Sequence, residues 1–425
     1  MKKIFVSIGL AAAGAAGLPS AFAQGMEAGA TPKIWNVAAN LRGFYDDNYA
    51  VAHDKTGSFG FELTPSVSAN VALQQTDIGV KYTFGMYYYL QRAQNGITPL
   101  DYTHQGDLWV DHAFNERFKV TIADTVVSAQ DPQLVQGGAV VRTDGNNIVN
   151  HATVTLNSEW TRQFSTATHY GNNLVVYSDS STNSAASPSN AALLNRMEQN
   201  IGTDFQWHFQ PETIGFIGYN YSWVHYTAGK PISAPPATPI TLYSDARDSR
   251  THYGYVGLSD VFSPNLSGQA RVGVSLTDTF NDPISDQKTL APYADISLTY
   301  TYMPGCYVQA GFTQDQNATD VVAPSSSGQL TQYQQSSTVY ATWNHQITTK
   351  LSGSLVSQYQ YSTFKDGAYN NNTGDSTINA GLHLNYEISR HFSANAGYDF
   401  SELLSSISGR GNSRNVVYLG LGANY

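Results

Sequence analysis

Residues 266–277 read LSGQARVGVSLT, and this stretch decides the fold because every second residue in it is apolar or small. The first set comprises Leu266, Gly268, Ala270, Val272, Val274 and Leu276. The residues between them are Ser267, Gln269, Arg271, Gly273, Ser275 and Thr277. Successive side chains of a β-strand point to opposite faces. The stretch therefore predicts a strand with one apolar face and one polar face.

The same alternation recurs along the chain, at 59–71, 78–90, 152–156, 201–209, 294–302, 378–388 and 392–400. Extending the pattern predicts an all-β chain of about eighteen strands. Their expected starts lie near residues 34, 58, 76, 104, 118, 149, 164, 196, 213, 245, 266, 288, 306, 333, 350, 375, 391 and 414. The strands near 34, 149 and 245 have the weakest pattern, so sixteen strands remain an alternative.

The connections between these strands alternate in length. Very short turns are expected at 115–117, 210–212, 263–265, 303–305, 346–349 and 389–390. Longer polar segments are expected at 130–148, 179–195, 228–244, 280–287, 317–332, 364–375 and 403–413. This rhythm is typical of an antiparallel up-and-down barrel of the bacterial outer membrane, with short turns in the periplasm. The segments 130–148, 179–195 and 228–244 are candidates to fold inward, and the sequence does not choose among them.

Aromatic residues recur beside the short turns, where Tyr and Trp rings favour the headgroup level of a bilayer. We expect a girdle at the membrane interface formed by Phe114, Phe118, Trp160, Phe164, Phe209, Phe262, Tyr302, Trp343, Phe392 and Tyr425. Aromatic residues of an ordinary core would instead be scattered along the strands.

The composition agrees with a transmembrane barrel. Charged residues make up 13% of the 425 residues, against about 25% in typical soluble domains. High aromatic content argues against disorder, and the net charge of −10 disfavours nucleic-acid binding. We find no nucleophile elbow, zinc-protease motif or phosphate loop. We therefore expect no enzyme, no cofactor and no metal site.

The two ends of the chain indicate export and barrel assembly. Residues 1–23 combine Lys2 and Lys3 with an apolar run and a small-residue cleavage site, which predicts a Sec signal peptide. Its removal would change the formal charge from −10 to −12, because two lysines are lost. Residues 24–33 are expected to form a short periplasmic segment, too short for a plug domain, and 34–425 the barrel. The alternating last strand, which ends at Tyr425, resembles the signal by which the barrel-assembly machinery recognises its substrates.

Charges within strands should avoid lipid and face the lumen. The alternation assigns twelve charged residues inward: Arg42, Glu62, Lys81, Asp107, Asp111, Lys119, Glu159, Asp204, Arg271, Asp295, Glu387 and Asp399. Eight acids against four bases predict a weak preference for cations. The alternative is that these acids and bases pair with one another and merely stabilise the barrel.

Taken over the whole mature chain, the pattern resembles the family called putative β-barrel porin type 2. The resemblance rests on the rhythm of strands and turns and on segments such as Phe59-Gly60-Phe61-Glu62-Leu63-Thr64-Pro65. It implies an outer-membrane channel, and some similar barrels belong to exopolysaccharide export systems.

Three functions remain open from the sequence. The first is passive diffusion of small hydrophilic solutes, the second is a conduit for exopolysaccharide with periplasmic partners, and the third is a structural barrel that displays its loops. Expected partners are outer-membrane lipid, lipopolysaccharide, the assembly machinery, and either small solutes or polysaccharide. The solute and the oligomeric state are left open.

Overall fold

The computed structural model describes residues 34–129, 134–135, 139–140, 147–178, 184–185, 188–285, 288–369 and 373–425. The predicted signal segment 1–23 and periplasmic segment 24–33 lie outside these residues. Among the described residues, no helix is long and apolar enough to cross a membrane.

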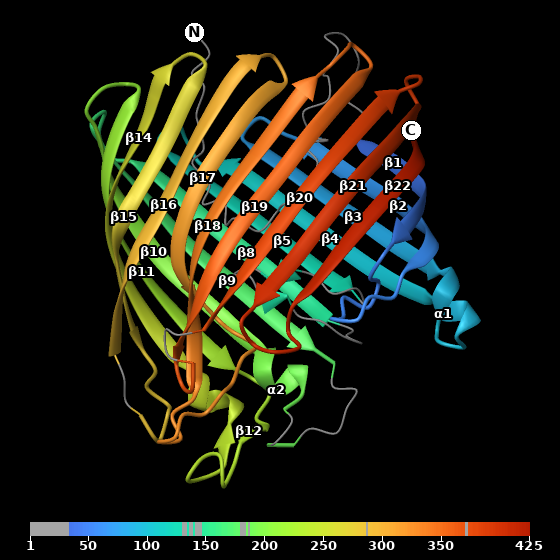
Figure 1. Cartoon of the computed structure of the whole chain (residues 1–425). Helices are drawn as coiled ribbons and strands as arrows, with labels where there is room; N and C mark the ends of the chain where they lie inside the picture. Colours follow the sequence, from blue (N-terminus) through green and yellow to red (C-terminus); the bar gives the residue numbers. More distant parts are fainter. Residues whose placement is uncertain are drawn as a thin grey trace.

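The chain forms one closed sheet of eighteen antiparallel strands (Figure 1). The first nine are β1 (Trp35–Asp46), β2 (Ser58–Ala72), β3 (Thr76–Tyr89), β4 (Leu100–Ala113), β5 (Phe118–Ala129), β8 (Asn147–Glu159), β9 (Phe164–Tyr177), β10 (Arg196–His208) and β11 (Thr213–Tyr226). The other nine are β14 (Ser249–Ser263), β15 (Leu266–Asp278), β16 (Lys288–Met303), β17 (Cys306–Asn317), β18 (Thr331–Gln346), β19 (Leu351–Asp366), β20 (Gly374–Glu387), β21 (Phe392–Ser405) and β22 (Asn412–Asn424). The predicted eighteen-strand barrel is confirmed, including its three weakest strands.

Smaller elements lie in the connections. They are the strand pairs β6 (Leu134–Val135) with β7 (Ala139–Val140) and β12 (Pro231–Ser233) with β13 (Leu242–Tyr243), the helices α1 (Leu90–Gln94) and α2 (Asn190–Leu194), and the 3-10 helix η2 (Ser244–Arg247).

Each barrel strand pairs with its neighbour in sequence, and β1 closes the ring by pairing with β22 from Ala38↔Asn424 to Asp46↔Val416. Closure leaves no barrel strand with an unpaired edge, which is the condition for a sheet to sit in lipid. The two faces of this wall follow from the two-residue period of the sequence. On β15, Val272 and Val274 are each 48% exposed on the outer face, whereas Arg271 is 4% exposed on the inner face.

The connections sort by length onto the two ends of the barrel. Eight turns of two to four residues lie at one end, where β22 finishes and β1 begins. The other end carries nine longer connections, of which the longest is 227–248, and the elements α1, α2 and β12 lie there (Figure 1). This arrangement is that of outer-membrane barrels, in which long loops face the outside. We call the end with the long connections the outer mouth.

Candidate functional site

The inner face of the wall is the first part of the candidate site. All twelve charged residues expected there share a face with the polar residues of their strands, opposite the exposed apolar side chains. Arg42 lies opposite Glu62 in register, with Nη1 3.5 Å from Oε2. Lys119 Nζ lies 3.2 Å from Asp111 Oδ1. Neighbouring strands therefore bring several acids and bases together.

Other inward charges lie against polar neighbours. Lys81 is opposite Asp107 in register, and Asp107 accepts hydrogen bonds from Gln105 Nε2 at 3.0 Å and Thr125 Oγ1 at 3.0 Å. Asp399 Oδ1 lies 2.8 Å from His383 Nε2. These contacts hold the carboxylates along the wall.

Two of the predicted pore-lining residues lie at the rim of the lumen. Glu159 is the last residue of β8 and Glu387 the last of β20, and both are exposed at the end with the short turns. They therefore lie at the opening on the side of the short turns.

A charge cluster on one wall contains one base and two acids. Arg271 on β15 places Nη2 3.2 Å from Asp204 Oδ2 and Nη1 3.5 Å from Asp295 Oδ2. Tyr255 donates a hydrogen bond of 2.6 Å from its hydroxyl to Asp204 Oδ1. The guanidinium lies over the Phe216 ring, 5.2 Å from its centroid. The cluster carries one excess negative charge when all three ionisable groups are charged.

The aromatic residues expected at the interface gather at the end with the short turns. The rings of Phe118 and Trp160, beside consecutive turns, lie 5.7 Å apart in an edge-to-face arrangement. Trp343 Nε1 donates a hydrogen bond of 2.8 Å to the Tyr302 hydroxyl. The ring centroids of Tyr425 and Trp35 lie 5.8 Å apart, where β22 pairs with β1 to close the barrel. Phe209, Phe262 and Phe392 are among the most exposed of the set, as are Phe114 and Tyr425. Phe164 begins β9 beside the same end.

The second part of the site is the outer mouth, where long connections pack on one another. Helix α2, in the connection from β9 to β10, packs against Val175 and Tyr177, which face inward on β9. Ser189 caps this helix by accepting a hydrogen bond of 3.3 Å from the Ala192 backbone N–H. The described part of the predicted segment 179–195 thus folds over the inner face.

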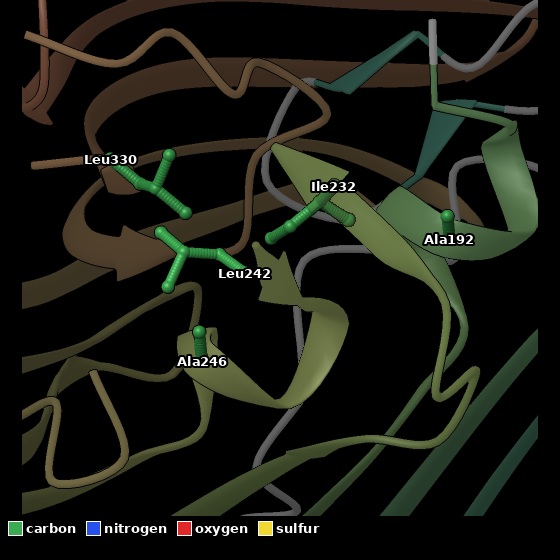
Figure 2. Packing of buried hydrophobic residues seen from close by; sticks show 5 residues of the cluster. All are labelled: Ala192, Ile232, Leu242, Ala246 and Leu330. Carbon is green, nitrogen blue, oxygen red and sulfur yellow. The ribbon is translucent and has the colours of Figure 1, made fainter. Parts of the chain in front are cut away.

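An apolar cluster joins three of these connections, as Figure 2 shows. Its buried members come from the β9–β10, β11–β14 and β17–β18 connections: Ala192, Ile232, Leu242, Ala246 and Leu330. All five are at most 2% exposed. Burial of this apolar surface stabilises the packed arrangement of the three connections. Most of the segment 130–148, the other candidate to fold inward, lies outside the described residues.

Arg247, at the end of η2, ties the same three connections together through their backbone. Its Nη1 donates to the Leu193 carbonyl at 3.1 Å, and its Nη2 donates to the Thr319 carbonyl at 2.6 Å and the Gln332 carbonyl at 3.3 Å. No carboxylate among the described residues forms an ion pair with it. Burial lowers the pKa of the Arg247 guanidinium. Carbonyl dipoles therefore solvate this buried cation.

Arg410 joins the β21–β22 connection to the others. Its Nη1 and Nη2 donate to the two oxygens of Asp320 at 2.6 and 2.7 Å, and its Nε donates to Asp375 Oδ2 at 2.8 Å. Although burial lowers the pKa of the Arg410 guanidinium, the two carboxylates raise it above its ordinary value. The bidentate contact to Asp320 is the strongest geometry available to such a pair.

These contacts connect loops from different sides of the outer mouth. A cavity of about 410 Å³ is lined by Asn190 from the β9–β10 connection and by Asp320 and Arg410. Around the ring, β10 and β21 are nine strand steps apart, and β9 and β22 are seven steps apart by the other route. Loops from nearly opposite sides of the rim therefore line one cavity. We call the packed β9–β10, β11–β14, β17–β18 and β21–β22 connections the mouth bridge.

Sequence reasoning missed the residues that build this bridge. Arg247, Asp320 and Arg410 lie in polar loops without periodicity, and their partners are far away in sequence. The sequence signal was limited to Arg410, which is the one charged residue in 406–411.

The expectation that strand charges face inward is wrong for Asp124. This residue shares a face with the exposed Val126 on β5 and accepts a hydrogen bond of 2.5 Å from Asn150 Nδ2 on β8. The amide reduces the cost of placing a carboxylate on the outer wall. Charged residues also occupy the outer face near the strand ends, as at Arg250 and Asp278.

In the part of the chain that the structure describes, no group of three or more His, Cys, Asp or Glu residues is arranged to hold a metal ion.

The chain is similar to one protein family in sequence and to several solved structures in fold. The family model described as "Putative beta-barrel porin 2" matches residues 23–425. Similar solved structures include the outer membrane protein OpdK from Pseudomonas aeruginosa, with 9% identity, a TM-score of 0.43, and coverage of 92% of this chain and 99% of that one. OccAB3 from Acinetobacter baumannii has 10% identity, a TM-score of 0.44 and the same coverages.

A third similar structure is OccK9 (OpdG) from Pseudomonas aeruginosa, with 10% identity, a TM-score of 0.46, and coverage of 92% and 98%. Similarity at this level carries no inference about solutes. A search of the curated proteins found no match.

Proposed function

Because the chain belongs to the family described as Putative beta-barrel porin 2, and is a porin-like barrel of the bacterial outer membrane, we propose that it conducts small hydrophilic solutes by passive diffusion, with a weak preference for cations. Barrels of sixteen to eighteen strands are wide enough to leave an aqueous channel. The family and the fold need no catalytic site for this function.

The mouth bridge is the observation that supports small solutes. Loops from nearly opposite sides of the rim meet around Arg410 and Asn190, so a solute entering from outside must pass beside them. A conduit for exopolysaccharide needs an outer opening that accommodates a polymer. A barrel that serves only to display loops needs no polar inner wall. The packed bridge and the polar wall together favour diffusion of small solutes over both alternatives.

The charge distribution supports the cation preference. Arg271 is shared by Asp204 and Asp295 on the wall, and Arg410 is shared by Asp320 and Asp375 at the mouth. Each group carries two carboxylates for one guanidinium. Rings or clusters of acidic side chains favour cations in a channel, because anions are repelled at short range.

We predict that D204N/D295N reduces the cation preference. The change removes both carboxylates of the Arg271 cluster and leaves the Arg271 charge, so the ratio of cation to anion permeability should fall toward one. The reversal potential of the purified protein in a planar bilayer, under a gradient of potassium chloride, measures this ratio.

The matched control is E116Q, which removes one acid from an exposed short turn outside the lumen. It should keep the reversal potential of the unmodified protein. Clear anion selectivity of the unmodified barrel would contradict the proposal.

A further inference from the structure

A row of charged residues crosses three strands on the outer wall, next to the outer mouth. Arg250 on β14 is opposite Asp278 on β15, and Asp278 is opposite Lys288 on β16. All three share the outward face with Leu276 and Leu290, which are 39% and 66% exposed. Each leucine lies two residues nearer the middle of its strand, at the next outward-facing position. The charges therefore lie above an apolar band that faces the acyl chains.

The position of the row along the strands sets its depth. Arg250 is the second residue of β14, Asp278 the last of β15 and Lys288 the first of β16. All three thus lie where the wall leaves the hydrocarbon on the outer side. Aromatic side chains gather beside them, as expected at the headgroup level. The Tyr219 hydroxyl lies 2.7 Å from His252 Nδ1, and Arg250 lies over the Phe280 ring, 5.1 Å from its centroid.

These side chains surround a hollow rather than a flat surface. A cavity of about 340 Å³ is lined by Tyr221, Arg250, His252, Leu276, Asp278 and Lys288. We call it the outer-wall notch. It opens on the outside of the barrel and is separate from the lumen and the mouth bridge.

The electrostatics of the notch favour an anion. Asp278 accepts two hydrogen bonds from Arg250 through the same oxygen, at 3.1 Å from Nε and 3.0 Å from Nη2, and this contact orients the guanidinium. Lys288 forms no ion pair with any residue that the structure describes. Two cations and one anion leave a surplus positive charge, although the whole chain has a net charge of −10.

We propose that the outer-wall notch binds the phosphate of an outer-leaflet lipid, in the manner of phosphorylated lipid A. Arg250 and Lys288 contact the phosphate oxygens from two strands, and Leu276 and Leu290 contact the acyl chains below it. Clusters of basic residues at the edge of a membrane segment are how proteins recognise anionic headgroups. Arg suits this task because its planar donors match phosphate oxygens.

The test compares the affinity of the purified, folded protein in detergent for bisphosphorylated lipid A, measured by titration in native mass spectrometry. R250Q/K288Q should bind about tenfold more weakly, because both phosphate contacts are lost. K288Q alone should bind about threefold more weakly, and it cannot break a described ion pair of the fold. R250K/K288R keeps both charges and should retain most of the affinity.

The matched control is K350Q/R390Q, which removes the same two charge types from exposed turns at the opposite end of the barrel. It should bind lipid A like the unmodified protein. Heat-modifiable gel mobility checks that each variant is folded, and unchanged channel conductance keeps this test independent of the proposed function.

Three results would overturn the proposal. One is unchanged affinity in both R250Q/K288Q and K288Q. Another is equal binding of lipid A from which the phosphates have been removed. The third is displacement of bound lipid A by millimolar inorganic phosphate, which would show that the notch recognises a free ion and not a lipid headgroup.

Discussion

Replacing Arg410 by methionine should open the mouth bridge and raise the single-channel conductance, with larger current fluctuations. The guanidinium makes three hydrogen bonds to Asp320 and Asp375. Without it, the buried Asp375 and the partly buried Asp320 lose their shared cation and repel each other. Removing one partner from a buried ion pair costs about 3–5 kcal/mol. The cost falls on the contact between connections and leaves the closed sheet intact.

Hydrogen exchange measures this loss separately from conductance. In R410M, the backbone amides of 318–330 should exchange faster than in the unmodified protein, because local opening needs less free energy. R92M is the matched control. Arg92 lies in the β3–β4 connection, where its Nη1 is 2.7 Å from Asp101 Oδ2 on the adjoining strand β4. Its guanidinium lies over the Tyr49 ring of the β1–β2 connection, 4.9 Å from the centroid, so it joins only neighbouring connections. Unchanged conductance and exchange in R410M would contradict the mouth bridge.

Replacing Arg271 by methionine should lower the free energy of unfolding by about 3–5 kcal/mol. The substitution leaves Asp204 and Asp295 close together on the inner wall with no base between them. Arg271 and Asp204 are both about 5% exposed, so water screens the repulsion poorly. Urea unfolding of the barrel in lipid vesicles, followed by tryptophan fluorescence, measures the change.

Two further variants separate charge from packing. R271M/D204N/D295N should recover most of the lost stability, because the uncompensated carboxylates are gone. R42M should cost less than R271M, since the Arg42 side chain is 26% exposed and its ion pair with Glu62 is better hydrated. An R271M barrel within about 0.5 kcal/mol of the unmodified protein would show that the cluster is not electrostatically coupled.

The strand count and the two faces of the wall could be predicted because their cause is local. In Leu266–Leu276, as in most strands, the alternation of apolar and polar residues within the strand itself decides which face meets lipid. The expected strand starts near 104 and 245 lie four residues from the observed starts at Leu100 and Ser249. Near these two starts the alternation is broken, because polar and aromatic residues occupy both faces of the strand.

The mouth bridge could not be predicted because its contacts are distant in sequence and irregular. Arg247 and the Thr319 carbonyl are 72 residues apart, and Arg410 and Asp320 are 90 apart. No local pattern indicates such partners. The position of Asp124 on the outer wall could not be predicted either, because it depends on Asn150 of the next strand. The alternation could predict that Asp204, Arg271 and Asp295 face inward. It could not predict that both carboxylates share Arg271, because that depends on how β10, β15 and β16 lie in the closed barrel.

Single-channel recording of the purified, folded protein in a planar bilayer, with neutral polymers of increasing size in the bath, tests the central claim most directly. We predict a steady conductance that small polymers reduce, because they enter the lumen, and that larger polymers on the outer side leave unchanged, because the mouth bridge excludes them. Absence of conductance, or entry of large polymers from the outer side, would contradict a small-solute channel crossed by its own loops.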